Sequence, residues 1–145
     1  MLRPQRAAQQ CDDQNVAIWT LRDIETAVRS AWSLETCDPV DVDDWSVTNP
    51  ARGQCGVTAL VLHDLLGGEL LTAEVLLPDG SRQGYHHWNR LAGGIEVELT
   101  AEQFDVTEVV QPPSVIERHG QSAGRFAEQY DVMRERVFAA LAAPR

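Results

Sequence analysis

The sequence of 145 residues contains no lysine, and all 12 of its basic residues are arginines. A Schiff-base lysine, a pyridoxal-phosphate anchor and a P-loop lysine are therefore excluded. The 22 acidic residues give a formal net charge of −10. Binding to nucleic acid or to an anionic membrane requires a basic surface that releases counterions. We therefore expect neither nucleic acid nor a membrane as a partner.

Cysteine is also scarce, since the chain has only Cys11, Cys37 and Cys55, far apart and without a CxxC pair. This spacing fits neither a disulfide framework nor a zinc site. The sequence also has no apolar run of signal-peptide or membrane-span length. These absences predict a cytoplasmic protein without a metal or another cofactor. They leave the oligomeric state open.

What is present is an ordinary globular composition, with 43% hydrophobic and 23% charged residues. This composition and the chain length predict one domain with a buried core. Residues 1–15 are polar and show no period, which predicts a disordered N-terminal arm. The single domain is expected to cover residues 16–145.

Hydrophobic periodicity predicts the elements of this domain. A helix over residues 16–32 is followed by a long polar loop. The next helix, GQCGVTALVLHDLLGG, is apolar on nearly every side and ends at Gly67 and Gly68. The later elements are a strand over 69–77, a hairpin of 85–91 with 95–99, and a closing helix over 125–141. The order helix, helix, strands, helix predicts an α+β fold. In it, the N-terminal and central helices pack on an antiparallel sheet, and a helix closes the chain.

Cys55 is the first candidate for chemistry, because it opens the apolar helix shortly after Gly53. A helix N-terminus carries partial positive charge, which favours thiolate over thiol. Its unpaired N–H groups are also suited to hold an oxyanion. The alternative is structural, since free cysteine often acts as a small buried hydrophobic residue.

A nucleophilic cysteine needs a base, and the chain has four histidines. His63 follows Cys55 by eight residues on the same helix, about 12 Å at about 1.5 Å per residue, which is too far. His119 is expected to be a surface residue. His86 and His87 in the hairpin are therefore the candidate bases, each of which could instead be a partly buried structural histidine.

The hairpin register decides between these two histidines. A three-residue loop over 92–94 places His86 on the same side as Glu98, whereas a two-residue loop of Gly93–Gly94 places His87 there. The longer loop also groups the apolar side chains Leu91, Ile95, Val97 and Leu99. On that ground we favour His86, and His87 is the alternative base.

Glu98 is suited to orient the imidazole as the third member of a Cys–His–acid group. Its alternative role is that of a solvated strand carboxylate. Gln54 and Asn49 are candidate amide donors for oxyanion binding or substrate positioning, although each also fits a turn or capping role. The candidate site includes suitable metal ligands, but no HxxxH or CxxC spacing supports a metal.

Several segments resemble the YunG-like family of small bacterial proteins, namely SAWSLET, NPARGQCGVTALVLHDLLGGELL, HHWNRL and VELTAEQF. The resemblance runs from about Ala27 to the final helix. It implies an arrangement similar to papain-like folds, with the family cysteine at Cys55, its histidine at His86 and its acid at Glu98. The chain departs from the family pattern at His87, where an aromatic residue is usual, and at Glu98, where Asp is usual. The resemblance implies no activity.

Three functions follow as expectations. The first is a papain-like cysteine hydrolase or acyl transferase that acts on an amide or ester of a small molecule or peptide through Cys55, His86 and Glu98. A neutral or cationic substrate suits the acidic surface. The second is a non-catalytic binding or regulatory protein with a vestigial site. The third is a redox sensor that needs only an exposed thiol.

Overall fold

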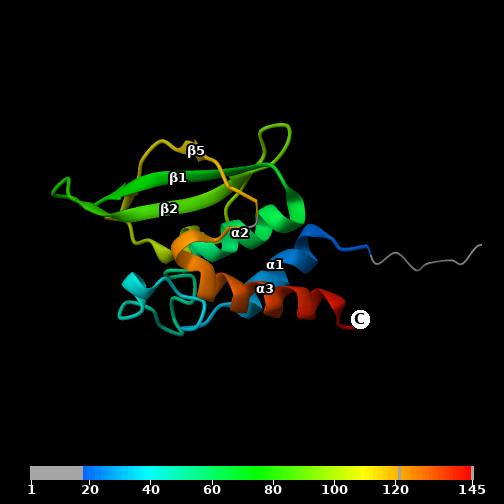
Figure 1. Ribbon diagram of the computed structural model, residues 1–145. Coiled ribbons are helices and arrows are strands. Elements are labelled where there is room, and N and C mark those ends of the chain that lie inside the picture. The colour runs from blue at the N-terminus through cyan, green and yellow to red at the C-terminus, as the bar shows by residue number, and fades with distance from the viewer. Residues whose placement is uncertain (1–17, 121, 145) are drawn as a thin grey trace, which may run out of the picture.

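The computed structural model describes residues 18–120 and 122–144, and in this part of the chain helices cover one side of an antiparallel sheet (Figure 1). The helices are α1 (Leu21–Ala31), α2 (Cys55–Leu66) and α3 (Ala127–Ala142). The strands are β1 (Glu69–Leu76), β2 (Arg82–Arg90), β3 (Glu96–Val97), β4 (Val109–Val110) and β5 (Ser114–Ile116). Short 3₁₀ turns span Pro39–Asp41, Ala101–Gln103 and Gly124–Phe126. This arrangement confirms the predicted α+β fold.

Helix α2 lies between the sheet and the pair formed by α1 and α3 (Figure 1). Its first eight residues are all buried, as the continuous apolar sequence predicts. The amide of Asn89 on β2 donates to the carbonyl of Ala59 over 2.9 Å, which fixes the helix against the sheet. The helix ends at Gly67, whose positive φ of 68° suits glycine and whose N–H bonds to the His63 carbonyl.

The main core lies between the helices and the sheet, and a smaller one lies on the other side of the sheet. The fully buried members of the main core include Val28, Val57, Val61, Met133 and Val137. The smaller cluster consists of Leu71, Ala73 and Trp88. Both sides of the β1–β2 pair are therefore covered, which allows the alternating side chains of β2 to enter two different environments.

The sheet is ordered β3-β2-β1-β4, and β5 also pairs with β1. In the hairpin, Asn89 pairs with Val97 and Arg90 with Glu96, and the Leu91 N–H bonds to the Ile95 carbonyl over 2.7 Å. The connection is therefore the three-residue loop, as predicted. This register puts the side chain of His86 on the side from which Glu98 approaches.

Other expectations need correction. Helix α1 begins at Leu21, because Thr20 and Asp23 form a reciprocal capping box that ends the extended chain there. Ile18, which precedes the helix, and Leu21, its first residue, are 77% and 64% exposed. Strands β4 and β5 were not predicted individually. The predicted arm over residues 1–15 lies outside the described residues.

No helix in the described part of the chain is both long enough and apolar enough to cross a bilayer.

A candidate Cys–His–Glu site

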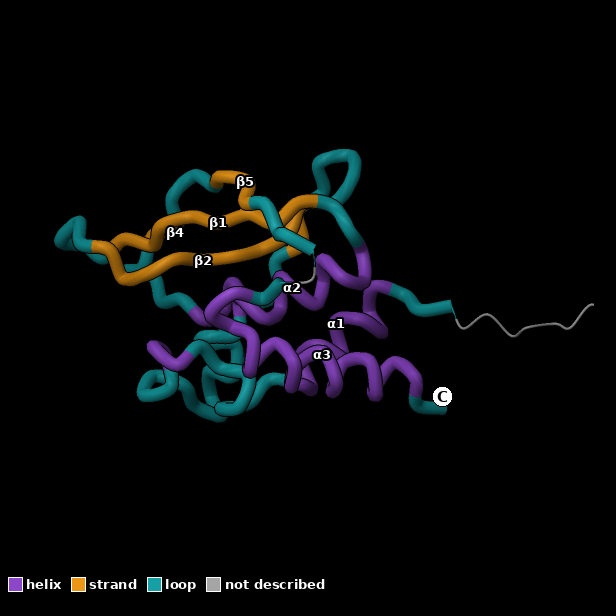
Figure 2. Tube along the Cα trace, viewed as in Figure 1, coloured by secondary structure: helices purple, strands orange, loops and turns teal. Residues whose placement is uncertain are grey.

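Cys55, His86 and Glu98 come from three parts of the fold. Cys55 is the first residue of α2, His86 lies in the middle of β2, and Glu98 follows β3. The loop between α1 and α2 folds back beside the start of α2 (Figure 2), where the Asp38 N–H bonds to the Gly53 carbonyl over 2.8 Å. The first turn of α2 is thereby held between this loop and the sheet.

Glu98 orients the imidazole of His86. One carboxylate oxygen, Oε2, is hydrogen-bonded to His86 Nε2. The other, Oε1, accepts from the N–H of Thr100 at 2.7 Å and from its hydroxyl at 3.0 Å. The carboxylate is therefore fixed at both oxygens, and it fixes the ring in turn.

Two aromatic rings complete the cage around His86, which is only 2% exposed. Trp88 stacks on the imidazole with ring centroids 5.2 Å apart, and Phe104 meets it edge-on at 4.8 Å. The Trp88 indole N–H is itself held by Glu96 at 3.0 Å. The ring of His86 therefore has little freedom to turn.

The second nitrogen of His86, Nδ1, is buried and makes no hydrogen bond of standard geometry with any described residue. Cys55 nevertheless interacts with the imidazole of His86. Because Glu98 is bonded to Nε2, the nitrogen that can accept a proton from Cys55 or donate one to it is Nδ1. Burial lowers the pKa of His86, but the interaction with Cys55 and the bond to Glu98 outweigh burial and raise it from 6.5 to about 9. The ring is therefore a cation at neutral pH.

His87 occupies a different environment, because successive strand residues point to opposite faces. Burial, together with the charges of His86 and Arg125, lowers the pKa of His87 to about 4. Its ring meets the edge of Phe126 with centroids 6.0 Å apart. Of the two histidines, only His86 is hydrogen-bonded to a carboxylate among the described side chains.

Cys37 lies near Cys55 but is a different kind of thiol. It is 1% exposed, and its sulfur is 3.5 Å from the Arg52 carbonyl. Burial and the charges of Asp41 and Asp38 raise its pKa to about 12. Cys37 is therefore a buried, neutral thiol and serves as an internal reference for Cys55.

The two candidate amide donors are held in structural bonds. Gln54 is fully buried, where its Oε1 accepts from the Thr36 hydroxyl at 2.7 Å and its Nε2 donates to the Ser33 carbonyl at 2.9 Å. The amide of Asn49 donates to the Gln103 carbonyl at 3.1 Å. Both side chains thus brace the loop before α2, and their role in substrate positioning stays a prediction.

The backbone at the start of α2 offers a further group of donors. No side chain caps this helix, and its first intrahelical bond runs from the Thr58 N–H to the Gln54 carbonyl. The preceding N–H groups of the first turn have no partner within the helix. They are therefore available to an oxygen atom of a ligand beside Cys55.

Sequence reasoning did not find Thr100, Phe104 and Gln103. Thr100 follows Glu98 by two residues, a spacing at which a side-chain carboxylate can accept the N–H of a following residue. Gln103 is 5% exposed, and its Oε1 accepts from the Gly53 N–H at 3.4 Å. No local signal shows that Phe104 contacts His86, because the two residues meet only through the tertiary fold.

Residues 18–120 and 122–144 contain no group of three or more His, Cys, Asp or Glu side chains placed to hold a metal ion.

The geometry defines a small α+β protein in which one buried histidine links a helix-start cysteine to a carboxylate. Comparison with known proteins gives its family: residues 20–142 match the family described as YunG protein, and the chain belongs to it. The chain is also 29% identical over 113 residues to the "Uncharacterized protein YunG" of Bacillus subtilis (strain 168), which covers 77% of this chain and 86% of that protein. No solved structure matches the chain significantly.

Proposed function

We propose that the protein is a cysteine-dependent hydrolase or acyl transferase that acts on an amide or ester through Cys55, His86 and Glu98. The observation that carries this proposal is the position of a single imidazole between the two other groups. Such an arrangement is the general signature of an activated nucleophile whose base is oriented by a third group. It is the arrangement that the papain-like resemblance implies.

The charge of His86 supports the first step. A cationic imidazole beside a thiol favours the thiolate, which is the nucleophilic form. The Cys55 sulfur attacks the carbonyl carbon, a carbon–sulfur bond forms, and the backbone N–H groups at the start of α2 hold the oxyanion. The bond to the leaving nitrogen or oxygen then breaks, and His86 gives that atom its Nδ1 proton. The product of this step is a thioester on Cys55.

The second step reverses the proton transfer. Neutral His86 takes a proton from water, or from an amine in a transferase, and the resulting nucleophile attacks the thioester. The carbon–sulfur bond breaks, the acyl product leaves, and the thiolate and imidazolium are restored. Glu98 holds the ring orientation throughout and stabilises its cation. Glu98 is therefore a positioning residue.

The second candidate function is a non-catalytic binding or regulatory protein. The observation that favours it is the low exposure of Cys55, 9%, which limits access to the sulfur. The two functions differ in whether an acyl intermediate forms on Cys55. A vestigial site would bind its ligand without forming one.

The test is acylation by p-nitrophenyl acetate. We expect a burst of p-nitrophenolate and an acetyl group that peptide mass spectrometry locates on Cys55. Cys55→Ala should abolish the burst, whereas Cys37→Ala should leave it unchanged. An equal burst in wild type and Cys55→Ala, or the absence of a Cys55 adduct, contradicts the proposed function. The absence of a Cys55 adduct in the folded wild type is the result that the non-catalytic binding protein predicts.

A further inference from the structure

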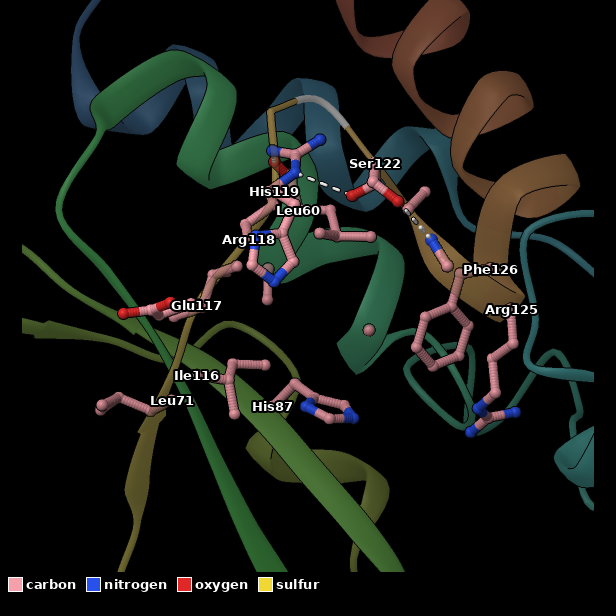
Figure 3. Close-up of a pocket in the computed structure, with 15 residues that line it drawn as sticks. Leu60, Leu71, His87, Ile116, Glu117, Arg118, His119, Ser122, Arg125 and Phe126 are labelled. Atoms are coloured by element: carbon pink, nitrogen blue, oxygen red, sulfur yellow. Dashed lines mark hydrogen bonds between the residues drawn. The ribbon is translucent and has the colours of Figure 1, made fainter.

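A cavity of about 270 Å³ opens beside the first turns of α2 (Figure 3). Its walls come from α2, from β1 and β2, and from residues 116–119 and 122–126. Figure 3 shows His87 and Ile116 on the sheet side of the space and Leu60 and Phe126 across from them. None of these side chains belongs to the Cys55, His86 and Glu98 group, and the proposed reaction gives the cavity no role.

The floor of the cavity is apolar. It is formed by the buried residues Ala59, Leu60 and Leu70. His87 adds a ring that is uncharged at neutral pH, because burial lowers its pKa to about 4. A charged ligand group would lose its hydration on this floor without gaining a partner.

Two arginines line the cavity, and both are already paired. Arg118 donates to Asp64 at 2.7 Å, and Arg125 forms two bonds with Asp38 at 2.9 and 2.6 Å. Glu117 is exposed. Both arginines among the described lining residues are thus paired with carboxylates, which gives the cavity little preference for an anionic ligand.

The cavity is adjacent to the candidate nucleophile along α2. Gly56, which lines it, directly follows Cys55, and consecutive Cα atoms lie about 3.8 Å apart. His87 also lines the cavity, but its side chain points to the face of β2 opposite to that of His86. The Phe126 ring packs on Gly56, where an added Cβ would come within 2.7 Å of it, so glycine allows the cavity wall to approach the first turn of α2.

We infer that this cavity receives the acyl part of the substrate, and that the substrate class is a neutral amide or ester with an apolar acyl group larger than acetyl. The inference rests on the proposed function, because it assumes that Cys55 carries the acyl group. The volume is sufficient, since a dry apolar cavity of about 150 Å³ already holds a benzene molecule. A linear chain of several carbons or an aromatic ring therefore fits the space.

The first experiment compares p-nitrophenyl hexanoate with p-nitrophenyl acetate as acylating reagents. The rate of Cys55 acylation by the hexanoate, divided by the rate with the acetate, should exceed the same ratio for free N-acetylcysteine by at least about tenfold. Each methylene that the cavity buries should raise the acylation rate several-fold. Ala59→Leu fills the floor, and Ala123→Leu fills the rim in an irregular segment that tolerates substitution better. Both should remove the preference for hexanoate, whereas the matched control Ala139→Leu, on an exposed part of α3, should keep it.

The second experiment uses Cys55→Ser, which cannot form the thioester, and measures binding of hexanamide and acetamide by NMR titration. We expect hexanamide alone to shift the resonances of Leu60 and Leu70, and Ala123→Leu to abolish the shifts. Acylation of Cys55 without chain preference and without hexanamide binding overturns this inference and leaves the proposed function intact. Hexanamide binding with no acylation in wild type overturns the proposed function and leaves an apolar binding cavity.

Discussion

His86→Ala is expected to slow the alkylation of Cys55 by iodoacetamide at pH 7 by at least about tenfold. The pKa of His86, about 9, makes its ring a cation at this pH, and the thiolate that the cation favours is the form that iodoacetamide attacks. Removing the ring removes the cation and leaves Cys55 in a largely buried position. The rate is measured by quenching at intervals and quantifying the alkylated Cys55 peptide by mass spectrometry.

Two other residues of the protein, His87 and Cys37, provide the controls for this experiment. His87→Ala removes the neighbouring imidazole, which is uncharged at pH 7, and should leave the rate within about twofold of wild type. Cys37, buried and neutral, should stay unmodified in the folded protein and reports any loss of structure in the variants. An unchanged rate in His86→Ala, or a loss confined to His87→Ala, contradicts the assignment of His86.

Asp64→Ala is expected to lower the free energy of unfolding by about 3–5 kcal/mol. Asp64 lies on α2, and its carboxylate accepts hydrogen bonds from two other side chains. It accepts from Arg118 at 2.7 Å and from the Tyr130 hydroxyl at 2.5 Å. Arg118 has a side chain only 4% exposed, so removing the carboxylate breaks a buried ion pair inside the fold.

Urea unfolding followed by circular dichroism measures this effect. The matched control is Asp131→Ala, which removes an exposed carboxylate from α3 and should change the free energy of unfolding by about 0.5 kcal/mol or less. Because small domains are stable by only about 5–15 kcal/mol, the Asp64 variant should unfold at a much lower urea concentration. Equal stability of the two variants would show that the Asp64 group contributes no more than an exposed charge.

The elements nearest the candidate site could be predicted because their signals are local. The continuous apolar run after Cys55 and the two glycines after Leu66 specify a buried helix and its end without reference to the rest of the fold. The hairpin register followed from the loop length and the apolar pattern. That register alone places His86, rather than His87, beside Glu98.

The remaining features depend on contacts between distant parts of the chain. The aromatic cage unites Trp88 with Phe104, and the Asp64 group unites α2 with α3 and with Arg118. Neither has a pattern in the local sequence. Strands β4 and β5 are two and three residues long and mostly exposed, so their pairing with β1 produces no clear hydrophobic alternation. The cavity beside α2 likewise forms only where residues 116–119 and 122–126 meet α2, β1 and β2.

The central claim is that His86 is coupled to both Cys55 and Glu98, and the direct measurement is an NMR titration of its imidazole. The account predicts a pKa of about 9 in the wild type. Cys55→Ala and Glu98→Gln each remove a group that raises this pKa, so each should lower it. In the double variant burial dominates, and the value should fall below the ordinary 6.5. A wild-type pKa at or below 6.5, unchanged by Cys55→Ala, would contradict the coupling.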